Sequence, residues 1–504
     1  MNSDTNSGPD IELSGQLHGH VSGEVNGHVK RLLKGDIDGD MKSSLEHGTN
    51  KHSDKDSPQH FSYSSEPENG PKAWEIVSRW ETSLGPSHEH WWRLTGPQLS
   101  TMLEEAGYPV HKQLEIVLFH YHRVVPYMGP KPELDGSFKW KSLVSSDGVP
   151  LEYSWKWDTP SKDPEIRFTI EAINEFSGTV ADPLNQTPAI ELLQGLEGRV
   201  PDLNQDWTSH FLSNFYDHDK AKYLREAEDG SGMPLRSTML VCFELGRNVI
   251  STKTYMGPRR LGQQGFACLA QYMPAIRQLG PSRALDILND FLGTSKEGSY
   301  LRPFMLAVDN VEPPSSRLKL YFATVRTSFA SMREIMTLGG RVSSDKIEQK
   351  LRTLHELVKA IMPVPLDLPD NADIPGPELP EYSADATAST SIDLATERPN
   401  FVVGYQYYFD IAPGAEFPDI KFYAPIRKDM MDDLTVANGL TRWMESQGRG
   451  AFCQNYMRVL RGLAGERSLS ECHGIQTHIC CMIKKDGQFD ITSYLAPGVP
   501  GSSN

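Results

Sequence analysis

The stretch Asp147–Trp157, DGVPLEYSWKW, places a turn signal directly before a run in which aromatic and polar residues alternate. In a β-strand, side chains two positions apart project to the same face. One face would hold Leu151, Tyr153, Trp155 and Trp157, and the other Glu152, Ser154 and Lys156. Glu152 could be solvated on an exposed face or could point into a polar cavity, and the stretch alone leaves both interpretations open.

Outward from this stretch, helix and strand signals follow one another in a regular order. Amphipathic periodicity predicts helices at 73–80, 98–106, 112–125, 206–226, 265–279, 282–292, 328–338, 343–361, 432–446 and 452–463. Alternation predicts five hairpins, at 138–144 with 150–157, within 237–255, at 304–310 with 317–325, at 402–411 with 420–424, and at 477–484 with 489–494. The segment 165–174 also alternates, but the sequence offers it no partner.

This order of elements predicts a barrel. Strands joined by hairpins are antiparallel, and a sheet that closes on itself has no exposed edges. We therefore expect an α+β fold in which an antiparallel ten-stranded β-barrel is enclosed by a ring of α-helices. It would form a single domain over residues 71–498, with a disordered polar leader over 1–70 and a surface loop rich in Pro, Asp and Ser over 364–399.

Composition restricts the class of protein further. The chain has 504 residues and a formal net charge of −16, which argues against affinity for nucleic acid or an anionic membrane. No apolar run approaches the roughly 18 residues of a membrane span, and the polar N-terminus lacks a secretory signal. The six cysteines show no metal-binding spacing and are expected to be free thiols. We therefore expect a cytoplasmic protein.

Cations and tyrosines two residues apart recur on three of the expected strands. They occur in Lys253-Thr-Tyr255, Arg317-Leu-Lys319-Leu-Tyr321 and Lys421-Phe-Tyr423. Arg167 adds a cation on the strand after Glu152. If these faces point inward, the five cations would repel one another unless an anion such as a diphosphate were bound. The tyrosine rings would suit a carbocation, because π-faces attract cations. Each motif alone is also compatible with a solvated outer strand face.

These motifs carry a resemblance to a known family. The anchors are Trp91-Trp92, Ala106-Gly107-Tyr108, Met128-Gly129-Pro130, Asp147–Glu152, Asp182-Pro183-Leu184-Asn185, the three cation-tyrosine motifs and Pro418–Pro425. In this order, from about Trp74 to Tyr494, the chain resembles the fungal aromatic prenyltransferases of the dimethylallyltryptophan synthase type, whose αββα barrel is called the ABBA fold. The resemblance implies a prenyltransferase that alkylates an aromatic ring with a dimethylallyl carbocation.

The resemblance also implies roles for individual residues. The diphosphate of dimethylallyl diphosphate would be bound by Arg167, Lys253, Tyr255, Arg317, Lys319, Tyr321, Lys421, Tyr423 and Tyr494. The carbocation would be shielded by Tyr255, Tyr321, Tyr423, Tyr494 and His478, the last standing where the family usually has a tyrosine. Glu152 would be the catalytic carboxylate that accepts an indole N–H, with Leu151 beside it in the acceptor site. The base that removes the final ring proton is not identified.

No metal site or cofactor is expected. Chain-elongating prenyl synthases hold Mg²⁺ with DDxxD motifs, which this chain lacks. The protein's cations would take the place of Mg²⁺, which would not be essential, and activity should survive a chelator. The partners are then dimethylallyl diphosphate and a small aromatic acceptor, with a homodimer left open.

Three hypotheses for the function follow, two of which differ in the acceptor of the prenyl group. The first is an indole-containing secondary metabolite, such as a tryptophan derivative or an indole diterpene. The second is a phenolic polycycle such as a xanthone, quinone or polyketide, with which Trp155-Lys156-Trp157 is compatible. The third is a barrel that binds a small aromatic anion without catalysis. We expect Lys253→Gln to separate the enzymes from the binding protein. We expect Glu152→Gln to reduce turnover strongly with an indole and not with a phenol.

Overall fold

The computed structural model describes residues 72–145, 147–157, 162–342, 347–374, 404–484 and 488–499. The expected leader over 1–70 lies outside the described residues, and so does the part of the expected loop from 375 to 399. The remainder of that loop, 364–374, contains no helix or strand. Within the described residues no helix is long and apolar enough to cross a membrane. All six cysteines are free thiols, as expected.

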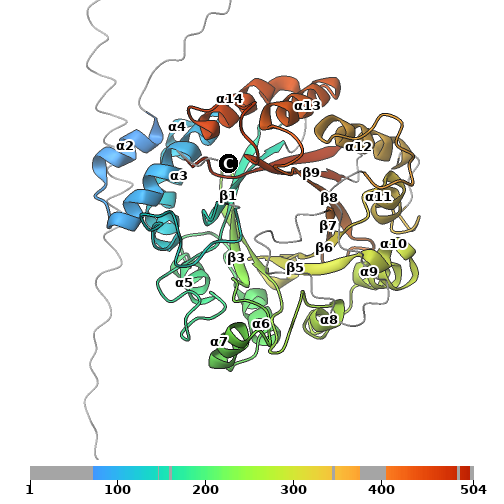
Figure 1. The fold of residues 1–504 in the computed structure, drawn as a ribbon, viewed down its shortest axis with the longest axis horizontal. Helices are drawn as coiled ribbons and strands as arrows, with labels where there is room; N and C mark the ends of the chain where they lie inside the picture. The colour runs from blue at the N-terminus through green and yellow to red at the C-terminus, as the bar shows by residue number, and fades with distance from the viewer. Residues whose placement is uncertain are drawn as a thin grey trace, which may run out of the picture. The chain divides into compact units, whose positions relative to one another are not determined.

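Ten antiparallel strands close into one barrel (Figure 1). Each strand pairs with its neighbours in chain order, and the last strand pairs with the first. The strands are β1 (Leu151–Trp157), β2 (Glu165–Ile170), β3 (Met239–Leu245), β4 (Ile250–Met256), β5 (Arg302–Asp309), β6 (Leu318–Thr324), β7 (Tyr405–Ile411), β8 (Asp419–Pro425), β9 (Gln476–Ile483) and β10 (Phe489–Leu495). The expected fold class is confirmed.

Helices surround the barrel on its outside (Figure 1). They are α2 (Ala73–Trp80), α3 (Pro86–Glu105), α4 (Val110–Phe119), α5 (Thr187–Gly195), α6 (Asp206–Phe215), α7 (Lys220–Asp229), α8 (Leu269–Arg277), α9 (Arg283–Thr294), α10 (Lys296–Tyr300), α11 (Phe329–Met336), α12 (Ile347–Ile361), α13 (Asp433–Ser446) and α14 (Cys453–Ala464). The helix expected over 206–226 is two helices, α6 and α7, which are separated by Tyr216–Asp219. Residues 120–127, after α4, form a π-helical turn and then a 3₁₀ turn.

Local sequence explains where these helices begin and which face they bury. The side chains of Ser282 and Asp432 accept hydrogen bonds from backbone N–H groups in the first turns of α9 and α13, as N-cap residues do. On α14, residues at spacings of three and four face the barrel, and the buried ones include Tyr456, Val459, Leu460 and Leu463. The core therefore lies between the helices and the outer face of the barrel.

The first hairpin differs from the sequence-based prediction. The segment 138–144 is not a strand. β1 pairs instead with β2, which lies in the segment 165–174 for which the sequence offered no partner. The carboxylate of Glu171, just after β2, accepts hydrogen bonds from Trp140 Nε1 at 2.8 Å, Ser142 Oγ at 2.6 Å and Leu143 N at 2.8 Å. The segment bonds to a side chain rather than to a neighbouring backbone, so its alternation does not produce a strand.

The alternation in β1 is confirmed. Leu151, Tyr153 and Trp155 are fully buried on the outer face. Tyr153 donates a hydrogen bond to the carbonyl of Thr95 on α3 at 3.1 Å, and the Trp155 ring packs 6.0 Å from the Tyr456 ring of α14. The polar residues of β1 consequently face the barrel interior.

Candidate active site

The motifs that pair a cation with a tyrosine place these residues at two levels of the barrel interior. On β4, β6 and β8 the tyrosine follows its cation by two residues, so both side chains face inward. These alternate strands run in the same direction, because each is antiparallel to the strand between them. The cations therefore form one level and the tyrosines the next.

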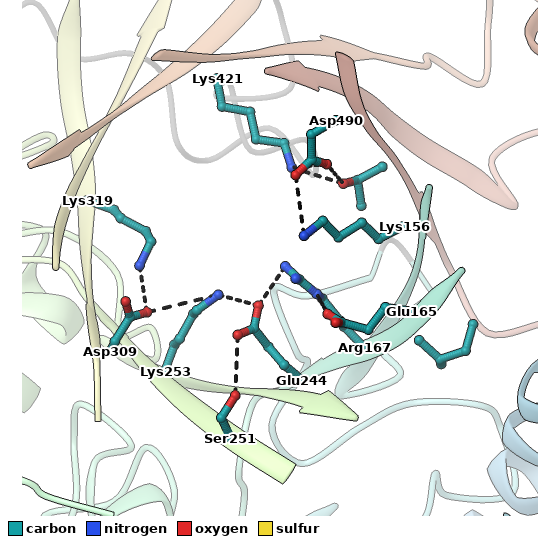
Figure 2. Close-up of polar contacts among 12 residues, drawn as sticks. Lys156, Glu165, Arg167, Glu244, Ser251, Lys253, Asp309, Lys319, Lys421 and Asp490 are labelled. Atoms are coloured by element: carbon teal, nitrogen blue, oxygen red, sulfur yellow. Dashed lines mark hydrogen bonds and ion pairs between the residues drawn. The ribbon is translucent and has the colours of Figure 1, made fainter. Parts of the chain in front are cut away.

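The cations are part of an ion-pair layer that also contains carboxylates (Figure 2). Lys319 Nζ lies 2.6 Å from Asp309 Oδ1, and Lys253 Nζ lies 4.0 Å from the same oxygen. Lys253 also bonds to Glu244, whose Oε1 is 2.6 Å from Arg167 Nη1. Four of the five expected cations thus share a continuous series of carboxylates, namely Arg167, Lys253, Lys319 and Arg317.

Arg317 and Arg167 mark the two ends of this series. Arg317 lies 2.7 Å from Asp309 and 3.0 Å from Asp410. At the opposite end, Arg167 Nε lies 2.6 Å from Glu165. Both guanidinium groups are therefore held in place before any ligand is considered.

A second group in the layer surrounds Asp490 on β10. Lys421 Nζ donates to Thr492 Oγ1 at 2.9 Å and lies 4.0 Å from Asp490, and Lys156 Nζ lies 3.3 Å from Asp490 (Figure 2). Lys156 and the carboxylates of this layer were not predicted from the sequence to be site residues. These carboxylates are Glu165, Glu244, Asp309, Asp410 and Asp490, and each lies within an expected strand. The same alternation that selected the cations would have found them.

Carboxylates therefore already neutralise the repulsion expected among the cations. Burial would raise the pKa of Glu244, but Arg167 and Lys253 hold that pKa well below its usual range. Burial would likewise raise the pKa of Asp309, which Lys319 and Lys253 hold below its usual value. Burial and the charge of Lys253 lower the pKa of Lys319 to about 8. At neutral pH Glu244 and Asp309 are thus ionised beside their cations, whereas burial raises the pKa of Asp410 at the end of the series.

A tyrosine layer lies beside the ion-pair layer and consists of Tyr255, Tyr321, Tyr408, Tyr423 and Tyr494. Ring centroids are 5.2 Å apart between Tyr321 and Tyr408 and 5.9 Å apart between Tyr423 and Tyr494. Burial raises the pKa of each of these tyrosines, so all keep their protons. The sequence analysis missed Tyr408, because the residue two positions before it is Gln406 rather than a cation.

A cavity of about 270 Å³ opens on the far side of the tyrosine layer. Its lining is mainly apolar, and its strand residues include Glu152, Leu240, Tyr255, Met305, Tyr321, Tyr423, His478 and Tyr494. None of the five expected cations is among the described residues that line it. Leu151, expected in the acceptor site, lies instead on the outer face of β1 and has no exposed surface. Its position follows from the alternation, which sends neighbouring residues to opposite faces.

Glu152 is the carboxylate of this cavity. Its Oε1 accepts a hydrogen bond from the hydroxyl of Thr477 at 2.7 Å. Burial raises the pKa of Glu152 to about 7, although the Thr477 hydrogen bond opposes the rise. His478 lies beside Thr477, and burial lowers the pKa of its imidazole to about 4. His478 is therefore neutral at pH 7 and would not repel a carbocation as a protonated imidazole would.

Two further features shape the wall of the cavity. Glu171, which binds the segment 138–144, also accepts a hydrogen bond from Ser237, and both Leu143 and Ser237 line the cavity. Arg236 lines it as well.

Among the described residues, no group of three or more His, Cys, Asp or Glu side chains could hold a metal ion.

A closed ten-stranded antiparallel barrel inside a ring of helices is the ABBA fold, which solved structures share with this chain. Residues 87–459 match the family model described as tryptophan dimethylallyltransferase, and the chain belongs to this family. The protein is a prenyltransferase.

Individual relatives agree with this assignment. Over 427 residues the chain is 64% identical to xanthone prenyltransferase A of Emericella nidulans, an alignment that covers 85% of this chain and 96% of that protein. It is 57% identical over 429 residues to prenyltransferase penI of Penicillium thymicola, covering 85% and 92%. The crystal structure of AnaPT from Neosartorya fischeri has the same fold, with a TM-score of 0.70, 23% identity and coverage of 86% and 100%.

Proposed function

We propose that this prenyltransferase moves a dimethylallyl group from dimethylallyl diphosphate to an aromatic carbon of a phenolic polycycle such as a xanthone. The observation that carries the proposal is the 64% identity to xanthone prenyltransferase A, which extends over 96% of that protein. A second relative, at 38% identity over 429 residues, is named xanthone prenyltransferase B. The phenolic acceptor thus replaces the indole as the first hypothesis.

The ion-pair layer is the proposed site for the diphosphate. Arg167, Lys253, Arg317, Lys319 and Lys421 are charged donors for phosphate oxygens. Each already lies within 4.0 Å of a carboxylate, so the cations are positioned without a ligand. A diphosphate that entered the layer would compete with these carboxylates for the same donors. In this proposal the lysine and arginine side chains neutralise the diphosphate charge in place of a metal ion, and a metal ion is not required.

The tyrosine layer is the proposed site for the dimethylallyl cation. Its rings present π-faces between the ion-pair layer and the cavity, and π-faces stabilise a cation of low polarity by about 0.5 to 2 kcal/mol for each contact. Tyr255, Tyr321, Tyr423 and Tyr494 also line the cavity. A carbocation held there would have the departing diphosphate on one side and the aromatic acceptor on the other.

Polar groups of the cavity support a phenolic acceptor. Arg236 carries a guanidinium that stays charged under all ordinary conditions. On the cavity wall it can pair with the negative charge of an ionised phenol, a charge that an indole ring lacks. Glu152 can accept a hydrogen bond from a phenol O–H or from an indole N–H. An indole acceptor therefore remains the second candidate, supported by the description of the family model.

The reaction would proceed as an electrophilic aromatic alkylation. The bond from the allylic carbon to oxygen breaks, and diphosphate leaves with both electrons. An aromatic carbon then attacks the dimethylallyl cation, and the resulting arenium ion loses a proton. The mainly apolar lining of the cavity disfavours water, which would otherwise capture the cation.

A panel of acceptors tests the proposal. The purified protein would be incubated with dimethylallyl diphosphate and with hydroxyxanthones, other phenols and indoles, and the products would be detected by mass spectrometry. We expect prenylated hydroxyxanthones to form fastest. Prenylation of indoles alone would contradict the phenolic acceptor, and the absence of any prenylated product together with tight binding of an aromatic anion would favour the non-catalytic barrel.

A further inference from the structure

A β-bulge in β9 brings two neighbouring side chains to the cavity. Tyr494 of β10 pairs with His478, whereas the next residue, Leu495, pairs with Gln476, so Thr477 is an extra residue in β9. In a regular strand Thr477 and His478 would face opposite sides. Here the Thr477 hydroxyl bonds to Glu152 and His478 lines the cavity. Bulges near active sites commonly redirect a side chain in this way.

The bulge completes a hydrogen-bonded series from His478 to Glu152. The Thr477 hydroxyl donates to Glu152 Oε1 at 2.7 Å, and His478 Nδ1 lies 3.3 Å from the oxygen of the same hydroxyl. Because that hydroxyl's proton is directed at Glu152, its oxygen accepts from Nδ1–H. The other ring nitrogen, Nε2, then carries a lone pair. Gln406 Nε2 lies 3.4 Å from His478 Nε2, at the outer limit of hydrogen-bond distance. This contact is weak enough for a proton from the substrate to displace it.

His478 also lies where the new bond would form. Its ring centroid is 6.4 Å from that of Tyr423 and 6.3 Å from that of Tyr494, two members of the tyrosine layer. An acceptor in the cavity that attacks a cation in this layer would therefore have His478 close to the alkylated carbon. This argument rests on the proposed function, since it assumes that the cation forms in the tyrosine layer.

We propose that His478 removes the proton from the alkylated ring carbon and that Thr477 relays a proton to Glu152. The C–H bond of the arenium ion breaks, its electrons restore the aromatic ring, and the proton binds His478 Nε2. In the same step the proton on Nδ1 passes to Thr477, whose own proton passes to Glu152. The carboxylate becomes a carboxylic acid, the imidazole returns to a neutral tautomer, and no charge is left over.

The acid-base properties of the two ends fit this direction of transfer. The pKa of His478 is lowered to about 4, so its imidazolium form gives up a proton readily at neutral pH. The pKa of Glu152 is raised to about 7, so its carboxyl group can hold that proton until it exchanges with water. His478 would thus transfer the proton and Glu152 would store it.

Other titratable groups around the cavity do not offer a competing base. They are Tyr255, Tyr321, Tyr423, Tyr494, Cys480, Arg236 and Arg259. The tyrosines and Cys480 have raised pKa values and keep their protons, because they are buried. The two arginines are cations and cannot accept a proton. Among the described residues facing this site, His478 and Glu152 are therefore the proton acceptors.

Thr477→Val and Thr477→Ser form the matched pair that tests the relay. Valine is close to threonine in shape but lacks the hydroxyl, whereas serine keeps it. We expect Thr477→Val to reduce kcat by roughly 10²-fold, within the range for general acid-base catalysis, and Thr477→Ser to retain most of the wild-type kcat. His478→Phe keeps an aromatic ring in the layer but removes both nitrogens, and should lower kcat as strongly as Thr477→Val.

An isotope effect distinguishes this role from a structural one. With an acceptor deuterated at the alkylated carbon, the wild-type enzyme should show no primary effect on kcat, because deprotonation follows the slow step. Thr477→Val and His478→Phe should both show a normal effect, since loss of the proton has become slow. If one of the two variants has a lower kcat but shows no isotope effect, the relay is overturned. It is likewise overturned if both variants keep the wild-type kcat. Neither result would contradict the proposed function. Failure of the wild-type protein to prenylate any acceptor would overturn the relay and the proposed function together.

Discussion

At one end of the barrel interior every expected cation lies within 4.0 Å of a carboxylate, whereas at the other end the buried carboxylate of Glu152 is bonded to a hydroxyl. The consequences for protonation are opposite. In the ion-pair layer, cations hold the pKa values of Glu244 and Asp309 below their usual range against the effect of burial. In the cavity, burial dominates and raises the pKa of Glu152 to about 7.

This difference suits the two regions to two functions, which are diphosphate binding in the ion-pair layer and proton acceptance in the cavity. A diphosphate needs fixed positive charge, and pairing with carboxylates holds that charge in place at a tolerable electrostatic cost. An arenium ion needs a group that can gain and lose a proton near neutral pH, which requires a carboxyl group away from strong cations. The tyrosine layer lies between the two environments and forms the wall of the cavity that is nearer to the ion-pair layer.

The largest expected effect comes from Glu152→Gln. The amide cannot accept the relayed proton, so we expect kcat to fall by roughly 10²- to 10⁴-fold with a phenolic acceptor. The same loss is expected with an indole, so the relay removes the distinction between acceptors that the sequence analysis expected from this variant. Steady-state kinetics at saturating donor would measure it. A variant with unchanged kcat would show that Glu152 receives no proton.

The pH dependence of the wild-type enzyme should report the same group. Glu152 must be ionised to receive a proton, so kcat should rise as the pH increases through about 7, the pKa of this carboxyl group. The tyrosines and Cys480 around it titrate above their usual values, and the nearby arginines stay charged, so this rise belongs to Glu152. The rise should be absent from the residual activity of Glu152→Gln. A flat wild-type profile between pH 5 and pH 9 would contradict this assignment.

Glu152→Gln should also change stability with pH. The pKa of Glu152 is raised in the folded protein from 4.5 to about 7. Its ionisation therefore destabilises the fold as the pH rises through this window, and the penalty stays constant above it. The rise in pKa corresponds to a loss of at most about 3 kcal/mol in the free energy of unfolding. Urea unfolding at about pH 5 and about pH 8 should show that Glu152→Gln gains more stability over the wild type at the higher pH.

In the ion-pair layer, Lys253→Gln should weaken donor binding. Lys253 bonds to Glu244 and lies near Asp309, so its loss removes one donor for the diphosphate and leaves more uncompensated negative charge. Loss of a hydrogen bond to a charged group costs about 1.5 to 3 kcal/mol, which corresponds to roughly a 10- to 150-fold increase in the KM for dimethylallyl diphosphate. An unchanged KM would place the diphosphate elsewhere.

The smallest effect should come from a chelator. The described residues contain no cluster of metal-binding side chains, and the proposed diphosphate donors are lysines and arginines. We therefore expect EDTA to leave kcat and the donor KM unchanged. Loss of activity in EDTA that Mg²⁺ restores would show that a metal ion shares the diphosphate site.

The parts of this account that the sequence predicted depend on simple alternation. That pattern put Glu152 and each cation-tyrosine motif on a single face of its strand, because a strand repeats every two residues. The resemblance to the family, rather than the alternation, indicated that these faces point into the barrel. The alternation failed for 138–144, where Glu171 supplies hydrogen-bond partners that no local pattern encodes. It also could not find the bulge at Thr477, since an extra residue in one strand is defined only by its register with the partner strand.

The ion pairs show a different limit. Glu244, Asp309 and Asp490 lie on expected strands, but the motifs that predicted the site were defined by their positive charges alone. Tyr408 was not predicted for a similar reason, because the residue two positions before it is Gln406 and not a cation. These residues were accessible to sequence reasoning, whereas the pairing of β1 with β2 required the three-dimensional structure.

Calorimetric titration with dimethylallyl thiolodiphosphate, a donor analogue, tests the division between the two ends most directly. The wild type, Lys253→Gln and Glu152→Gln would be titrated in parallel at one ionic strength, because charge interactions are screened by salt. We predict that Lys253→Gln weakens binding of the analogue by roughly 10-fold or more, whereas Glu152→Gln binds it as the wild type does. Equal weakening in both variants, or no weakening in Lys253→Gln, would contradict the separation of the diphosphate site from the acceptor cavity.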